Sequence, residues 1–116
     1  MIKLPIFDTG QYNGCELLMK NGEAKLIIKF LELADFSITF SKVRWHQFTA
    51  LPNCTTVQIN SSYFRLTNFE NSPELKIFLG SDKSPLKAYK ELHHYCIFLD
   101  ETGCHEFFAE SACIAV

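Results

Sequence analysis

The C-terminal third of the chain reads as two apolar strands joined by a short turn, and this pattern constrains the fold most. Residues 94–99 and 104–110 flank the segment Glu101-Thr102-Gly103. That segment fits a three-residue hairpin loop closed by a glycine in the left-handed region. The register that follows places Ile97 opposite Phe107. Side chains then alternate between two faces, because successive residues of a strand point to opposite sides of a sheet.

The two faces of this predicted hairpin differ in chemistry. One is an apolar core face, which comprises Tyr95, Ile97, Leu99, Phe107, Ala109 and Cys113, with His105 near the turn. The other mixes aromatic and acidic side chains, and it comprises His94, Cys96, Phe98, Glu106, Phe108 and Glu110. Neither a buried core nor a plain solvated surface requires such a mixture. We interpret the mixed face either as a binding surface or as a face covered by a helix or a second sheet.

Length and composition favour one cytoplasmic domain. The chain has 116 residues, of which 47% are hydrophobic. It is long enough to bury a core without stabilising disulfides or metal ions. No apolar run approaches the ~18 residues of a membrane span, and the first residues lack a signal-peptide pattern. The five cysteines, an odd number, are expected to be reduced and packed. The predicted hairpin register places Cys96 and Cys104 too far apart for a disulfide.

A second hairpin is predicted near the N-terminus. Asn21-Gly22 suits a type I′ turn, the strongest short-range hairpin signal. It pairs Met19 with Ala24 and also pairs Leu17 with Leu26 and Cys15 with Ile28, so that the apolar residues share one face. Residues 35–41 alternate as the next strand, and a tight loop at residues 33–35 pairs Ile28 with Phe40.

The middle of the chain is read as further strands. Val43 and Trp45 break the preceding alternation, which predicts a bulge or sharp bend. Residues 54–59 and 62–67 are predicted to form a third hairpin, residues 75–79 another strand, and residues 84–93 one short helix that starts at Ser84-Pro85. The total is about eight strands and one helix. We therefore predict a mainly β (α+β) domain over residues 1–116, an antiparallel meander that forms a sandwich or a partly open barrel.

Residue patterns that would carry out chemistry are weak. His94, Cys96 and Glu110 could be assembled into a metal site, but their spacing matches no standard zinc pattern. Glu106 and Glu110 would lie about 13 Å apart along one strand, which exceeds the carboxylate spacing of glycosidases. Signatures of serine nucleophiles and phosphate-binding loops are absent. We therefore expect no catalytic residues and no cofactor.

Charge is distributed unevenly along the chain. Five acidic residues and no lysine or arginine follow position 90. Such a segment is either ordinary solvated surface or an acidic patch that attracts a basic partner. Nucleic acid is disfavoured as a partner, because its binders carry basic stripes. The predicted partner-binding residues are those of the mixed face and the acidic turn: His94, Phe98, Asp100, Glu101, Glu106, Phe108 and Glu110.

Residues 89–110, YKELHHYCIFLDETGCHEFFAE, resemble segments of the small immunity proteins of bacterial toxin systems, including contact-dependent growth inhibition. The resemblance implies a protein without chemistry of its own that binds and neutralises a basic toxin, often a nuclease. The alternative is a β-barrel that binds an apolar small molecule in a cavity lined by some of the eleven phenylalanines.

Overall fold

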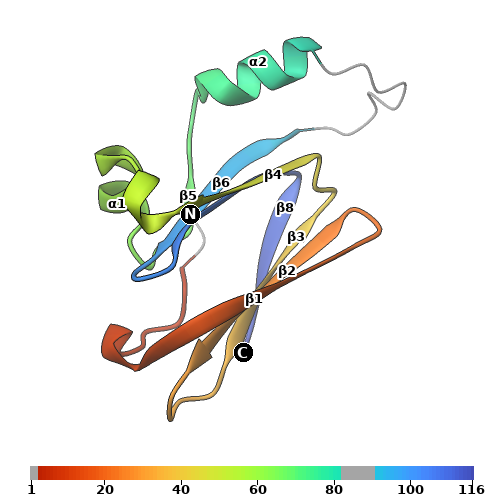
Figure 1. The fold of residues 1–116 in the computed structure, drawn as a ribbon. Coiled ribbons are helices and arrows are strands. Elements are labelled where there is room, and N and C mark those ends of the chain that lie inside the picture. The colour runs from red at the N-terminus through yellow and green to blue at the C-terminus, as the bar shows by residue number, and fades with distance from the viewer. Residues whose placement is uncertain (1–2, 82–90) are drawn as a thin grey trace.

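The computed structural model describes residues 3–81 and 91–116 and contains two four-stranded antiparallel sheets (Figure 1). The first sheet has the order β1-β2-β3-β8 and is formed by β1 (Tyr12–Lys20), β2 (Glu23–Phe30), β3 (Phe36–Ser41) and β8 (Ser111–Ala115). The second has the order β4-β7-β6-β5 and is formed by β4 (Trp45–Ala50), β5 (Thr67–Asn68), β6 (His93–Leu99) and β7 (Gly103–Ala109). The predicted mainly β, antiparallel fold is confirmed, as a sandwich and not a closed barrel.

Four short helices complete the described part of the chain. They are the 3-10 helices η1 (Thr9–Gln11) and η2 (Leu51–Asn53) and the α-helices α1 (Thr56–Ser62) and α2 (Pro73–Ser81). Figure 1 shows both α-helices on the side of the second sheet that faces away from the first. The molecule therefore has three layers, with the second sheet in the middle.

The N-terminal hairpin is confirmed residue by residue. Met19 pairs with Ala24 and Leu17 with Leu26. Asn21 and Gly22 have positive φ values of 52° and 78°, as a type I′ turn requires. The turn residues and the apolar alternation specify the same register, and this agreement explains why the sequence sufficed here.

The pairing of β2 with β3 differs from the prediction. Ile28 lies opposite Phe36, not Phe40, because the connecting loop turns around Glu32, two residues earlier in the chain than expected. The Asp35 side chain accepts a hydrogen bond from the Phe30 backbone N–H within this loop (3.4 Å). The shift of four residues is even, so the residues predicted for the core face still occupy it.

The C-terminal hairpin exists, but its register is shifted by two residues. Ile97 lies opposite His105 and Leu99 opposite Gly103. The turn is closed by a hydrogen bond from the Thr102 N–H to the Leu99 carbonyl (3.1 Å), and Glu101 is its left-handed residue (φ 64°). The faces of β6 and β7 remain as predicted, again because the shift is even. Cys113, which was predicted for the core face, instead lies in β8 of the first sheet and is exposed.

A sharp bend at Lys42 (φ 55°) carries the chain from β3 in the first sheet to β4 in the second. The phase break predicted near Val43 and Trp45 is thereby confirmed. Strand β7 continues into β8 in the same way, in the opposite direction between sheets. Hydrogen bonds from Arg44 N–H to the Phe108 carbonyl (2.8 Å) and from Glu110 N–H to the Ser41 carbonyl (3.0 Å) join the two bends.

Two strand predictions were wrong. Residues 54–67 form no hairpin: α1 occupies residues 56–62. Residues 75–79 lie within α2. In both segments a polar helix cap outweighs a strand-like apolar pattern, because capping satisfies backbone N–H groups at a helix start. Of the predicted helix at 84–93, residues 84–90 lie outside the described part of the chain, and His93 begins β6.

The main core fills the space between the sheets. The Phe40 and Phe107 rings stack with centroids 4.0 Å apart, and both side chains are fully buried. Such a pair contributes about 1 kcal/mol beyond the burial of its area. The other fully buried residues of this core include Ala24, Leu26, Ile28, Ile38, Ile97 and Leu99.

Gly103 is required for steric reasons. Its φ is 143°, and a Cβ there would overlap the Thr49 carbonyl oxygen of the neighbouring strand. We expect Gly103→Ala to lower the free energy of unfolding by about 2 kcal/mol or more, measured by urea denaturation. Gly80→Ala is the control, since a Cβ there meets nothing within 4 Å and a helical alanine is favourable. Equal effects of the two variants would contradict the steric explanation.

A polar cluster lies between β1, β4 and β7. His46 Nε2 is 3.1 Å from His105 Nδ1, and Cys15 Sγ is 3.8 Å from His105 Nε2. Burial, together with the neighbouring His46, lowers the pKa of His105 to about 4. Burial also lowers the pKa of His46. Both imidazoles are therefore neutral in the folded state near neutral pH.

This cluster predicts acid sensitivity. The pKa of His105 is about 6.5 in the unfolded state and about 4 in the folded state. Between these two pH values, His105 is protonated in the unfolded state but not in the native state. Stability is therefore complete above pH 6.5 and falls as the pH decreases towards 4, by up to about 3 kcal/mol from His105. Urea unfolding at several pH values should show a smaller loss for His105→Gln than for the wild type. His93→Gln is the control, and an unchanged pH profile for His105→Gln would refute the assignment.

Candidate functional site: a cleft between the second sheet and the two helices

A cleft of about 810 Å³ lies between the second sheet and the two α-helices. Its volume falls within the range of sites that bind small molecules or peptide side chains. The apolar part of its lining consists of Trp45, Val57, Phe69, Pro73, Ile77, Phe78 and Phe108. Its charged residues are Glu70, Glu74 and Glu106, and no lysine or arginine is among the described residues that line it. The cleft is therefore apolar and acidic.

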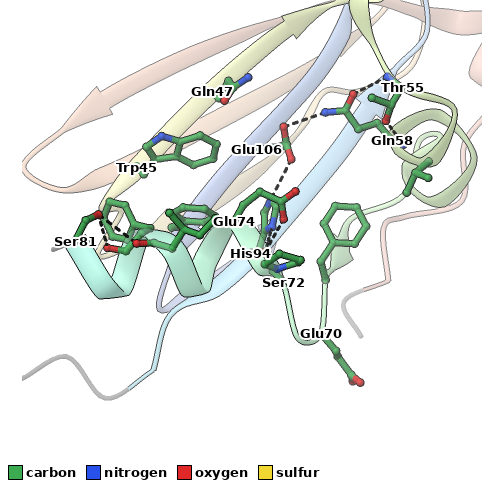
Figure 2. Close-up of a pocket in the computed structure, with 16 residues that line it drawn as sticks. Trp45, Gln47, Thr55, Gln58, Glu70, Ser72, Glu74, Ser81, His94 and Glu106 are labelled. Atoms are coloured by element: carbon green, nitrogen blue, oxygen red, sulfur yellow. Dashed lines mark hydrogen bonds and ion pairs between the residues drawn. The ribbon is translucent and has the colours of Figure 1, made fainter.

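A chain of hydrogen bonds crosses the floor of the cleft (Figure 2). His94 Nε2 lies 2.9 Å from Glu106 Oε1, and His94 Nδ1 lies 2.7 Å from Ser72 Oγ. All three residues are buried. An ionised carboxylate only accepts hydrogen bonds, so Nε2 carries a proton.

The chain continues to the start of α1. Gln58 Nε2 donates to the second Glu106 oxygen, Oε2, at 3.0 Å. Gln58 also closes the capping box of α1, because its Oε1 accepts from the Thr55 N–H (2.8 Å) and its own N–H donates to Thr55 Oγ1 (3.1 Å). Both oxygens of the buried Glu106 carboxylate are thus paired, which offsets the cost of burying it.

The other end of the chain is the start of α2. Ser72 Oγ accepts a hydrogen bond from the Leu75 N–H (3.1 Å) and is therefore the cap of this helix. The same hydroxyl donates a hydrogen bond to the Glu74 carboxylate (3.2 Å). The first turns of α1 and α2 are consequently linked through His94 and Glu106. This link fixes both walls of the cleft relative to its floor.

Aromatic rings form one side of the cleft. Trp45 stacks on Phe108 with centroids 4.3 Å apart, and Phe78 of α2 lies 5.2 Å from the same ring. Phe69 packs edge-on against the imidazole of His94 at 5.0 Å. Trp45 is half-buried, so its ring packs on Phe108 and also lines the cleft.

The predicted partner-binding surface is corrected by these observations. His94, Phe98, Glu106 and Phe108 are 2%, 1%, 8% and 2% exposed, so they do not form an open docking face. Helices and their flanking residues cover them: Tyr63, at the end of α1, stacks over Phe98, and Phe78 covers Phe108. Three of the four, His94, Glu106 and Phe108, line the cleft.

The remaining predicted residues lie away from the cleft. Asp100 and Glu101 are at the hairpin turn, where Asp100 accepts a hydrogen bond from the Tyr63 hydroxyl (3.4 Å). Glu110 is at the bend between β7 and β8. The seven predicted residues therefore do not share one surface.

The sequence contained signals for the residues that were missed. Thr55-Thr56-Val57-Gln58 has the Thr-x-x-Gln form of a capping box. Ser72-Pro73-Glu74 combines a serine cap, proline at the first helical position and an acid in the first turn. Reading these as helix starts would have identified Gln58, Ser72 and Phe78 as candidates for the walls.

The metal site considered for His94, Cys96 and Glu110 does not form. His94 lies opposite Phe108, not Glu110, because of the two-residue register shift. Within residues 3–81 and 91–116, no three His, Cys, Asp or Glu side chains are arranged to hold a metal ion.

Neither α-helix of the described chain has the length and apolar character that a membrane span requires.

Comparison with known proteins leaves the geometry as the basis for assigning a function. No protein-family model, curated protein or solved structure matches this chain.

Proposed function

We propose that this chain is a binding protein without chemistry of its own, and that its cleft receives a basic segment of a protein partner. The observation that supports this most directly is the lining of the cleft, in which aromatic side chains are combined with three glutamates and no cation from the described residues. A lysine or arginine side chain fits such a site, because aromatic faces and carboxylates both attract cations.

The position of each glutamate supports this proposal. Glu70 and Glu74 are exposed, and Figure 2 shows Glu70 pointing outward at the rim. Rim charges speed up the association of a partner of opposite charge. Glu106 is buried at the floor, where a cation that displaced water would interact with it more strongly than at the surface. Aromatic anchors around it supply apolar contact area.

The resemblance of residues 89–110 to toxin-immunity proteins agrees with a partner of this kind. We therefore propose a basic toxin domain, such as a nuclease, as the partner class. The proposal includes a cytoplasmic location, which is supported by five cysteines that are all free, since reducing compartments keep thiols unpaired.

The charge of the cleft can be tested with the protein's single tryptophan, Trp45, as the reporter. We expect a tetra-arginine peptide to change its fluorescence on titration. Glu70→Lys combined with Glu74→Lys should weaken the affinity about tenfold, which corresponds to about 1.4 kcal/mol, and should reduce its dependence on salt.

The matched control for this titration reverses two exposed acids outside the cleft, by Glu91→Lys combined with Glu101→Lys. The control should bind within about twofold of the wild type, since distant surface charges are screened by salt. Equal weakening in both double variants would show that net charge, not the cleft, attracts the peptide. Native mass spectrometry that finds an apolar molecule bound in the purified protein would instead support the ligand-binding alternative.

One observation favours a second candidate function, that of a serine hydrolase. Ser72, His94 and Glu106 are hydrogen-bonded in the order of nucleophile, base and acid. Two features weigh against it. The Ser72 hydroxyl is already engaged as a helix cap, and the Glu74 carboxylate, 3.2 Å away, would repel the oxyanion of a tetrahedral intermediate.

A fluorophosphonate probe separates these two functions, because it reacts with activated serines. We expect no adduct on Ser72 after incubation near pH 8, judged by intact mass and peptide mapping, since capping and the adjacent carboxylate leave this hydroxyl unactivated. A stoichiometric adduct on Ser72 that is absent in Ser72→Ala would replace the binding proposal with a hydrolase. The Ser72→Ala variant must retain the wild-type Trp45 emission for that comparison.

A further inference from the structure

Two cysteines of the C-terminal hairpin lie much closer together than their sequence positions predicted. Cys96 pairs with Glu106 and Cys104 with Phe98, so the two cysteines are diagonal neighbours on adjacent strands. Their Sγ atoms are 3.0 Å apart. The two-residue shift in register brings them closer together than the predicted register did.

Both thiols are sealed from solvent. Cys96 and Cys104 are each 0% exposed, and they form a small apolar cluster with Phe98, packed by Leu51, Ile59 and Phe69. The hydrogen bond between Cys96 and Cys104, together with burial, raises the pKa of Cys104. A thiol in this environment is protonated and reacts slowly with an oxidant in solution. Its oxidation would therefore have to proceed through a disulfide with another, more accessible thiol.

Cys54 is placed to make that delivery. It packs against the Cys96–Cys104 pair but is only partly buried. Its Sγ lies 3.3 Å from the Thr49 carbonyl oxygen. Burial raises its pKa, and a hydrogen bond from the Cys104 backbone lowers it in part. Three thiols thus extend from the surface to the buried pair.

We propose that Cys96 and Cys104 are a redox-active dithiol that forms a reversible disulfide, with Cys54 as the residue that first reacts with the oxidant. The oxidant class is a small organic disulfide such as oxidised glutathione. This inference concerns a different set of atoms from the proposed binding function and does not depend on it.

The steps balance as thiol–disulfide exchange. The partly exposed Cys54 thiol first loses its proton to solvent. The resulting thiolate attacks the small disulfide, forms a mixed disulfide and releases one small thiol. Cys104 then attacks the Cys54 sulfur and releases the second small thiol. Cys96 attacks the Cys104 sulfur and frees Cys54. In total, two protein thiols lose two electrons and two protons, and one small disulfide becomes two small thiols.

The geometry favours a bond that is easily reversed. The sulfur atoms need to approach from 3.0 Å to about 2.05 Å. Diagonal strand neighbours have Cα atoms about 7–8 Å apart, slightly beyond the usual range for a disulfide. Closing the bond therefore requires a small backbone movement and leaves the disulfide strained, and a strained disulfide is more readily reduced. This matches a reducing compartment, where disulfides that do form are transient.

The experiment uses the full chain with excess oxidised glutathione near pH 8. Intact mass should show the loss of two hydrogen atoms, and alkylation followed by peptide mapping should identify a Cys96–Cys104 cross-link. Cys54→Ser should form this cross-link about tenfold more slowly, since both remaining thiols are buried. Cys113→Ser is the matched control at an exposed cysteine, and it should cross-link at the wild-type rate.

Variants of the pair test the final step. Cys96→Ala and Cys96→Ser should both stop the exchange before the Cys96–Cys104 bond forms, leaving glutathione on Cys54 or a Cys54–Cys104 bond. Two variants are used because serine introduces a buried hydroxyl, whereas alanine keeps the site apolar; Trp45 emission checks that each is folded. A folded wild-type protein that gains glutathione only at Cys113 would overturn the proposal. A Cys54→Ser rate equal to wild type would overturn the role of Cys54.

Discussion

The hairpin β6–β7 is buried on both faces, and the rest of the structure depends on this constraint. Every residue from His94 to Leu99 and from Gly103 to Ala109 is buried. On one face, Ile97, Leu99 and Phe107 meet the first sheet. On the other, the two helices and their flanking residues cover the strands. A ribbon with one exposed face would leave Phe98 and Phe108 in water, at a cost of about 2 kcal/mol for each ring.

Burial on the helical side carries two polar side chains inward with the aromatic ones. A buried carboxylate or imidazole is costly unless hydrogen-bonded, and here each atom able to pair has a partner. Glu106 is held by Gln58 and His94, and His94 by Ser72. Gln58 and Ser72 also take part in the caps of α1 and α2. The cleft thus owes its shape to a satisfied network, in which losing one partner would leave a buried polar atom unpaired.

The sequence predicted most where local signals agree. At Asn21-Gly22, turn chemistry and apolar alternation specify one register, and that hairpin is correct in every pair tested. At residues 100–103, several turns fit, and the register differs by two. The faces of β6 and β7 were nevertheless predicted correctly, because strand side chains alternate with a period of two. The helices were missed because Thr55 and Ser72 signal helix starts within segments whose apolar residues also suit strands.

The sequence by itself determined the fold class, the faces of the paired strands and the bend after β3, because these follow from alternation and turn residues that are local in the chain. Only the tertiary structure decided which chemistry those faces acquire. It converted an expected open surface into the floor of a cleft, and it brought Cys96 within 3.0 Å of Cys104. The physical reason is that register and helix placement are set by long-range packing, in which residues as distant as Gln58 and Glu106 become neighbours.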